Sequence, residues 1–231
     1  MLNESIIQEL SHFSTPSVLN GLKHLGQGPE LLESVDRQTI RCLSPSLGVT
    51  CGYAATMKVE TDTVGDVSGF EPSPLTGQFY REIAALPEPR ILVVENVGHP
   101  EGPACIWGEV MANVYRAMGC QAGLTNGAVR DLPEMELAGF QTFANGLAVG
   151  GGLIRTIEVG TPVVVGGVKI ESGNVLHGDM HGILKVPDAL APELPAAIRA
   201  VEAFERRVVE FCRSSEFSLK GLAQVFTSER H

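Results

Sequence analysis

The stretch NGAVRDLPEME, residues 126 to 136, places an arginine beside an aspartate directly after a Gly-Ala-Val bend. On a bent backbone, the side chains of Arg130 and Asp131 can line one cavity. Asp131 offers a hard oxygen ligand for Mg2+ or Mn2+, ions that take one or two carboxylates and keep several waters. Arg130 offers a planar group that holds a carboxylate through two hydrogen bonds. The pair therefore suits a substrate that is itself a chelating acid, such as a 2-oxo acid.

The same stretch also has an interpretation without a site. Arg130 and Asp131 can form a surface ion pair, while Glu134 and Glu136 open a helix after Pro133, where the helix dipole favours acids. Glu134 then either orients Arg130 or only begins that helix. Composition alone favours the surface interpretation.

Glu109 begins a predicted helix over 109–118, directly after Trp107 and Gly108. A carboxylate is favoured at a helix start in any case. The free backbone amides at such a start can also bind the carboxylate of a small acid. The apolar face predicted for this helix comprises Val110, Val114, Ala117 and Met118.

Other motifs give weaker indications. His177 and His181 in HGDMHG have the spacing of helical zinc pairs, but Gly178 and Gly182 argue against a helix, so a polar turn is predicted there. The glycine-rich stretches match no phosphate-binding motif, and GxSxG is absent from the sequence. Near the end of the chain, Glu202 and Glu205 lie three residues apart and Arg206 lies four residues beyond Glu202, which is the spacing of ion pairs on a helix surface.

These residues need elements that position them. The stretch from Ser14 to Gly26 is predicted to form a helix, with Thr15 capping its exposed amides. A bent strand is predicted over 47–59, a loop over 64–74 and a buried strand over 91–94. Short strands separated by turns follow from residue 150 to 187, and an amphipathic helix covers about 196–213. No linker divides the sequence, so residues 1–231 are predicted to form a single domain.

Composition narrows the function. With 44% apolar residues the chain can bury a core, and its net charge of -10 argues against a nucleic-acid partner. Five dispersed cysteines indicate reduced core residues of a cytoplasmic protein, and neither a signal peptide nor a membrane segment is recognisable.

Several stretches together resemble the RraA-like family, which includes 4-hydroxy-4-methyl-2-oxoglutarate/4-carboxy-4-hydroxy-2-oxoadipate aldolases and regulators of ribonuclease activity. The most specific match is NGAVRDLPE with WGE about twenty residues upstream; supporting matches are FSTPSVLNGL, GVTCGYAATMKV, ILVVENVG, GTPVVVGGVKI and GDMHGILKVP. The resemblance covers roughly residues 12 to 210. It implies an α/β fold of the β/β/α swivelling type, assembled as homotrimers or homohexamers with sites at subunit interfaces.

The resemblance also implies a divalent-metal (class II) lyase. Asp131 would bind Mg2+ or Mn2+ directly, Arg130 would hold the substrate, and Glu109 would bind a metal-associated water. The amides of Val110 and Met111 would receive the substrate carboxylate. A glutamate from a neighbouring subunit's C-terminal helix is implied as well, and Glu205 fits best, with Glu202 as the alternative.

The expected reaction is cleavage of a 4-hydroxy-2-oxo acid to pyruvate and a second oxo compound, together with oxaloacetate decarboxylation. A non-enzymatic regulator that binds a ribonuclease is the main alternative. A methyltransferase is not supported, because the sequence contains no glycine-rich nucleotide-binding loop. The sequence departs from the family pattern at Asn126 and His181, where aspartates are usual. These departures bear more on the substrate than on the metal pocket.

Overall fold

One buried strand, β3 (Arg90–Asn96), lies inside the main sheet, and the layers of the fold pack on its two faces. The structure is a computed structural model that describes residues 2–35, 39–62, 74–98, 104–151 and 153–227. The helices are α1 (Glu4–Leu10), α2 (Thr15–His24), α3 (Pro74–Ala85), α4 (Glu109–Ala117), α5 (Leu132–Leu137), α6 (Leu194–Arg213) and α7 (Leu219–Thr227), with 3-10 turns η1 (Pro29–Ser34) and η2 (Pro45–Leu47). The other strands are β1 (Arg41–Cys42), β2 (Thr50–Asp62), β4 (Cys120–Thr125), β5 (Ala128–Val129), β6 (Gln141–Ala144), β7 (Gly146–Leu147), β8 (Leu153–Val159), β9 (Val163–Val165), β10 (Val168–Ile170), β11 (Val175–Asp179) and β12 (Gly182–Val186).

The main sheet has the strand order β1-β6-β4-β3-β2-β11-β12, and β8 also pairs with β2. Strands β2, β3, β4 and β6 run parallel, so each of the three connections between them must cross over the sheet. Helices α3, α4 and α5 lie in these three connections. The remaining strands of this sheet join antiparallel. The short strands predicted over 150–187 are thus confirmed. Helix α5 lies where the sequence allowed a helix after Pro133, whereas the crossover helix α3 is an addition to the predicted elements. The predicted loop over 64–74 lies outside the described residues except for Pro74.

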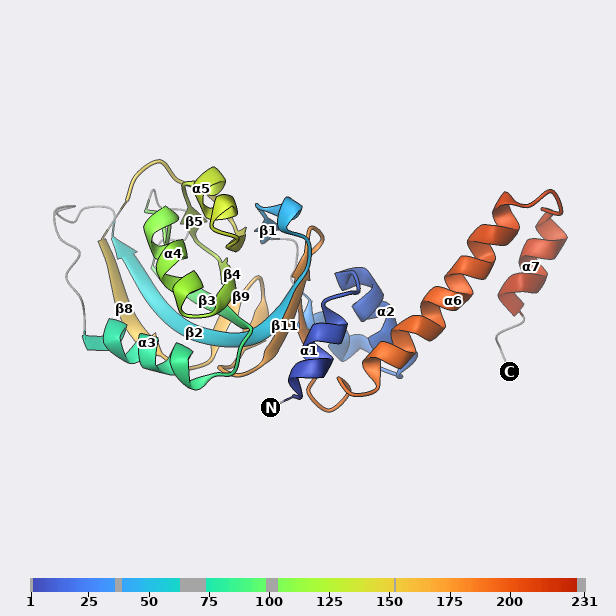
Figure 1. Ribbon diagram of the computed structural model, residues 1–231, viewed down its shortest axis with the longest axis horizontal. Coiled ribbons are helices and arrows are strands. Elements are labelled where there is room, and N and C mark those ends of the chain that lie inside the picture. The colour runs from blue at the N-terminus through green and yellow to red at the C-terminus, as the bar shows by residue number, and fades with distance from the viewer. Residues whose placement is uncertain (1, 36–38, 63–73, 99–103, 152, 228–231) are drawn as a thin grey trace.

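Strand β2 is long and strongly curved, as Figure 1 shows. Its first part pairs with β11 and its last part with β8, and a register shift falls between Lys58 and Val59. Gly52 permits the close approach of β2 to the Pro89 carbonyl, because a β-carbon at Gly52 would lie 2.5 Å from that oxygen. The bend predicted for this strand is confirmed, and it lets one strand serve two antiparallel partners.

The two faces of β3 carry different cores. Leu92 and Val94 pack against the layer of α3, α4 and α5, whereas Ile91 and Val93 pack against the β9–β10 hairpin. This alternation follows from the two-residue period of a strand. The fold is therefore layered as hairpin, sheet and helices, in agreement with the predicted mixed α/β class.

A third core joins α1 and α2 to the start of α6. Leu10, Leu22 and Ile198 are fully buried in it, and Gly21 lies so close to Ile198 that a β-carbon would be 2.6 Å from that side chain. Beyond this contact α6 extends away from the sheet, with α7 beside it (Figure 1). No helix in the described part of the chain combines the length and apolar character needed to cross a membrane.

Three local predictions are corrected. Ser14, not Thr15, caps α2, because its hydroxyl accepts a hydrogen bond from the Ser17 amide. The apolar face predicted for α4 is wrong: Val110 is 74% exposed, and Ala112 and Tyr115 are the buried residues. The apolar stripe predicted on the C-terminal helix is fully buried only at its start. Farther along α6, Phe204 contacts Phe226 of α7, and Phe211 contacts Phe217 in the turn before α7.

Candidate functional site

The segment that carries Arg130 and Asp131 runs between two neighbouring segments beyond the end of β4. On one side, the Ile106 amide donates to the Ala128 carbonyl over 2.8 Å, and the Arg130 amide donates to the Trp107 carbonyl over 3.2 Å. On the other side, β5 pairs in parallel with β7. This small sheet therefore fixes the backbone directly before Asp131.

Asp131 has an unusual backbone conformation. Its φ of 58° and ψ of 43° are left-handed, and within the described residues it is the one non-glycine residue with positive φ. Aspartate tolerates this region better than most side chains. Asp131 occupies the N-cap position of α5, yet its side chain makes no cap hydrogen bond there. Such backbone strain often accompanies a functional position.

The Asp131 carboxylate points to the start of α4 instead. Its Oδ2 accepts a hydrogen bond from the Glu109 amide over 3.1 Å and lies 3.4 Å from Arg130 Nε. The other oxygen, Oδ1, has no hydrogen-bond partner in the parts of the chain that the structure describes. The carboxylate is about one-third exposed, so this oxygen can bind a ligand from solvent.

Gly108 makes this arrangement possible. A β-carbon at Gly108 would lie 2.3 Å from Asp131 Oδ2 and 3.0 Å from Arg130 Cγ. Any side chain at Gly108 would therefore push the carboxylate away from the Glu109 amide. In the sequence, Gly108 stands out only as the glycine directly before Glu109 and the predicted helix. Its close contact with Asp131 could not be predicted from that position.

The start of α4 is open to an anion. Its N-cap residue is Gly108, which supplies no side-chain cap, and the amides of Val110 and Met111 have no hydrogen-bond partner among the described residues. First-turn amides and the helix dipole together attract negative charge. The Glu109 side chain is exposed at the same end. The structure thus brings Glu109, Val110 and Met111 to the Arg130–Asp131 pair.

Two other predicted residues behave differently. Glu205 is exposed on α6 and accepts a hydrogen bond from the Asn20 side-chain amide over 3.3 Å. Figure 1 shows α6 on the far side of the molecule from α4 and α5, so neither Glu205 nor Glu202 meets Asp131 within one chain. Glu134 lies exposed in the first turn of α5, and no ion pair with Arg130 is found in the described part of the chain. Glu134 therefore lies at the start of a helix, and its predicted role in orienting Arg130 stays a prediction.

Apolar residues surround the pair and remain exposed. Leu147 and Val149 flank Ala148, whose amide donates to the Val129 carbonyl, and they are 63% and 99% exposed. Val110 belongs to the same rim. Below it lies Cys105, and burial raises the pKa of its thiol, with Arg130 opposing. A protonated thiol is a poor nucleophile, so the charged pair and the open amides are better candidates for chemistry than Cys105.

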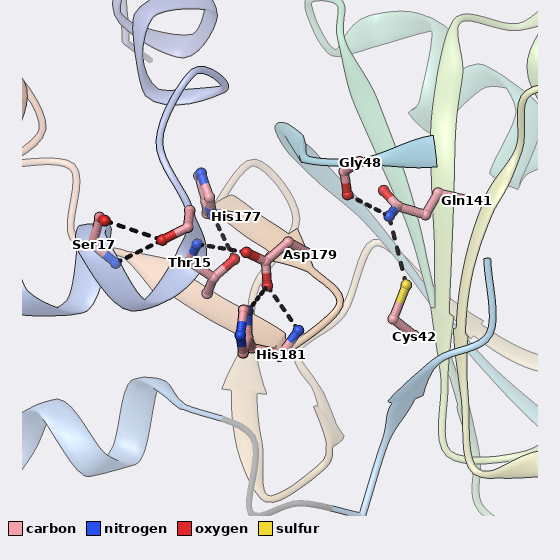
Figure 2. Close-up of polar contacts among 9 residues, drawn as sticks. Thr15, Ser17, Cys42, Gly48, Gln141, His177, Asp179 and His181 are labelled. Atoms are coloured by element: carbon pink, nitrogen blue, oxygen red, sulfur yellow. Dashed lines mark hydrogen bonds and ion pairs between the residues drawn. The ribbon is translucent and has the colours of Figure 1, made fainter. Parts of the chain in front are cut away.

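A second polar cluster, shown in Figure 2, attaches α2 to β11. Asp179 accepts hydrogen bonds from the Thr15 amide, the His181 amide and His181 Nδ1 at 2.9, 2.8 and 3.0 Å. Buried His177 lies 2.9 Å from the Thr15 hydroxyl and 3.1 Å from the Leu10 carbonyl. Both ring nitrogens of His177 are thus engaged, which supports the predicted polar turn over a zinc pair.

The pKa values in this cluster follow from burial and hydrogen bonding. Burial lowers the pKa of His177, although its hydrogen bond with Leu10 opposes this. Burial of Asp179 opposes ionisation, but the hydrogen bonds from Thr15 and His181 outweigh it and lower the pKa of the carboxyl. Within the described residues, no three His, Cys, Asp or Glu side chains gather as a metal-binding group. The cluster therefore has the character of a structural anchor.

All five cysteines are free in the structure. Cys51, Cys105 and Cys120 are buried, as expected of reduced core residues. Cys42 is partly buried and packs against the core beside the β9–β10 hairpin, whereas Cys212 is exposed on α6, so the core prediction is wrong for Cys212 alone among the five.

Comparison with known proteins places these features in a family context. The sequence profile of the RraA-like family, described as Aldolase/RraA, matches residues 18–184. Protein DlpA of Legionella pneumophila is 23% identical over 128 residues, which are 54% of this chain and 20% of that protein. The chain thus spans about a fifth of the length of this relative.

Two solved structures show the same fold. A protein of Pseudomonas syringae pv. tomato has a TM-score of 0.72 and 24% identity, with 97% of this chain and 94% of that chain covered. RraAS2 of Streptomyces coelicolor, described as an unusual member of the RNase ES inhibitor RraA family, has a TM-score of 0.67 and 18% identity, covering 89% and 96%. The fold class expected from the sequence is confirmed by these likenesses.

Proposed function

Because the chain belongs to the RraA-like family, we propose that it is a divalent-metal-dependent pyruvate aldolase with oxaloacetate decarboxylase activity. The family includes aldolase and decarboxylase members as well as ribonuclease inhibitors. One observation carries the choice of an enzyme. An aspartate with a free carboxylate oxygen, an arginine and the uncapped start of a helix meet within hydrogen-bond distance.

The donor set suits Mg2+ or Mn2+. Asp131 would bind the ion directly through Oδ1, while Glu109, and Glu205 of a neighbouring subunit, would bind it through water. A single direct carboxylate with several waters is a usual arrangement for Mg2+. The bound ion would polarise the oxo and carboxylate oxygens of the substrate and stabilise negative charge that develops there.

The chain's own groups account for binding. The amides of Val110 and Met111 would hold the C1 carboxylate of a 4-hydroxy-2-oxo acid. Arg130 would place its guanidinium next to the C2 oxygen, where charge develops as the bond breaks. Both contacts would place the substrate at the start of α4, beside Asp131.

Cleavage moves one proton and one electron pair. The C4 hydroxyl loses its proton as the C3–C4 bond breaks, and the electrons of that bond pass toward C2, which leaves pyruvate as its enolate. Glu109 would orient the water that accepts the proton and returns one to C3. Loss of CO2 from oxaloacetate gives the same enolate, so both reactions need the same stabilisation.

The test is a pyruvate-release assay with 4-hydroxy-4-methyl-2-oxoglutarate, 4-carboxy-4-hydroxy-2-oxoadipate and oxaloacetate, each with Mg2+, with Mn2+ and with EDTA. Asp131→Ala should lower kcat/KM by about a hundredfold or more, because it removes the direct ligand. Asp188→Ala is the control, since Asp188 is an exposed aspartate on the chain after β12. Release that persists in EDTA would refute the metal-dependent mechanism.

The ribonuclease regulator is the competing function, and the description of RraAS2 favours keeping it in the test. If no 2-oxo acid were turned over with either ion, and the chain bound a ribonuclease tightly, the regulator would replace the aldolase. The Asp131→Ala variant separates the two functions again: an aldolase loses turnover, whereas a regulator that leaves the pocket unused keeps its ribonuclease binding.

A further inference from the structure

A side-chain amide continues the sheet where β4 ends. The last paired residue of β4 is Thr125, opposite Val94 of β3. The next residue, Asn126, pairs with the backbone of Asn96 through its side chain. Its Oδ1 accepts from the Asn96 amide over 2.7 Å, and its Nδ2 donates to the Asn96 carbonyl over 3.0 Å. The amide group of Asn126 thus satisfies both backbone groups of one residue.

The side chain of Asn96 extends this link to β2. Its Oδ1 accepts from the amides of Thr61 and Gly98 at 3.3 and 3.1 Å, and its Nδ2 donates to the Thr61 hydroxyl over 2.9 Å. Asn96 and Thr61 are buried, at 3% and 2% exposure. Two amides therefore tie together the ends of β2, β3 and β4. Buried groups joined in this way are costly to leave unpaired.

Asn126 also begins the segment that ends in Arg130 and Asp131. Its neighbour Gly127 donates to the Thr125 hydroxyl over 3.0 Å and packs so closely on Ile106 that a β-carbon would lie 2.6 Å away. The far end of the segment is fixed by its pairing with Trp107 and β7. At the near end, the Gly127 carbonyl accepts from the Asn145 amide just beyond β6 over 3.1 Å, and the Asn126 amide adds the side-chain contact with β3 of the main sheet.

We propose that Asn126 is a positioning residue, which holds Arg130 and Asp131 in place by using both its donor and its acceptor. The proposal rests on the proposed function of the Arg130–Asp131 site. An aspartate at this position could not fill that role. An ionised carboxylate only accepts hydrogen bonds, so it would face the Asn96 carbonyl without a proton between the two oxygens.

The test compares Asn126→Asp with Asn174→Asp. Asn174 is also half-buried, and its Oδ1 accepts from the Glu171 amide over 2.9 Å in the turn before β11. An aspartate can keep this acceptor contact, whereas at Asn126 it loses the donor half. The two variants thus make the same chemical change, and only Asn126→Asp removes a hydrogen bond that anchors the segment before Arg130 and Asp131.

Three measurements at a temperature well below unfolding decide the matter. They are hydrogen exchange of the peptide covering 127–131, acrylamide quenching of Trp107, which is the single tryptophan, and Mn2+ affinity with kcat and KM. For Asn126→Asp we expect faster exchange, stronger quenching, and about a tenfold or greater loss in Mn2+ affinity or kcat. Asn174→Asp should match the wild type in all three.

Two outcomes would overturn the proposal. One is wild-type exchange and quenching in Asn126→Asp. The other is faster exchange with unchanged Mn2+ affinity, kcat and KM, since the amide would then be structural only. A wild-type chain without turnover or Mn2+ binding would instead refute the proposed function, and exchange and quenching would still show whether the amide holds the segment.

Discussion

At the scale of single residues, the site depends on close approach as much as on charge. Asp131 gives up the cap of its own helix and reaches the start of α4, and Gly108 leaves the space for it. Asp131 and Glu109, whose amide it binds, are 22 positions apart in the sequence, so their contact is tertiary. A residue without a side chain is thus as important here as the charged ones.

Substitution of Gly108 tests this directly. We expect Gly108→Ala to displace the Asp131 carboxylate and lower kcat/KM by about a hundredfold, because misplacement of a reacting group by about 1 Å costs that much. The melting temperature should fall little, since the site is half-exposed. Gly146→Ala is the control, because nothing lies within 4 Å of a β-carbon there. Equal kcat/KM for the two variants would contradict the role of Gly108.

The residue types of the site were predictable, but their contacts were not. Arg130, Asp131 and Glu109 have the right chemistry in the sequence, and resemblance to a family connects them. The left-handed backbone of Asp131 and the Asn126–Asn96 pairing depend on how distant segments meet. The roles of Arg130, Asp131 and Glu109 as metal ligands and substrate contacts stay predictions, as does the choice of Mg2+ or Mn2+.

At the scale of elements, the attachment of α2 to β11 responds to pH. The pKa of His177 is lowered by burial, with the Leu10 and Phe13 carbonyls and Asp179 opposing. Above the ordinary histidine pKa of about 6.5, both the folded and unfolded chains are neutral at this position. As pH falls below that value, the unfolded chain takes up a proton that the folded chain resists. Stability is therefore lost until pH passes the lower folded pKa.

We expect the free energy of unfolding to fall between pH 7 and pH 5 with a contribution of up to about 1.4 kcal/mol per pH unit from His177. His177→Gln should lower stability at neutral pH and flatten this slope. His24→Gln, at an exposed position, should keep the wild-type slope. Urea unfolding at several pH values measures the free energy of unfolding and its slope with pH. An unchanged slope in His177→Gln would show that other groups cause the pH dependence.

Element predictions succeeded where the local pattern was complete. The continuous apolar run of β3 and the cap of α2 are visible in a few residues, although the cap is displaced by one position. The face of α4 was misassigned because Val110 is apolar but belongs to the exposed rim of the site. Helix α3 was missed because the sequence periodicity is weak in this glycine-containing segment, whereas the helix allowed after Pro133 is present as α5. The limits of the predicted single domain remain a prediction.

At the scale of the whole molecule, the position of α6 has a consequence for assembly. Members of this family typically form oligomers. The described part of one chain keeps Glu205 apart from Asp131, while apolar residues stay exposed both around the site and on α7. We therefore expect the site to be completed by a neighbouring subunit in a homotrimer or homohexamer.

Mixing inactive subunits tests this arrangement. Asp131→Ala and Glu205→Gln should each lose most activity alone. Co-refolded in equal amounts, they should regain about a quarter of the wild-type sites, because a random head-to-tail ring places two intact partners together at that frequency. Repeating the mixture with Glu210→Gln, an exposed glutamate on the same helix, tests whether the position matters. No recovery in the first mixture would place Glu205 outside the site.

The curvature of β2 also determines when the chain can fold. Its first half pairs with β11 and its second half with β8. Thr50 therefore cannot pair until Gly178 is available, and Asp62 cannot pair until Leu153 is available. Such distant pairings slow folding, because a long loop must close before any contact repays its entropy. During synthesis, β2 therefore leaves the ribosome long before its antiparallel partners exist. A nascent chain that ends before residue 175 still exposes an open strand edge, the kind of edge that recruits chaperones or aggregates.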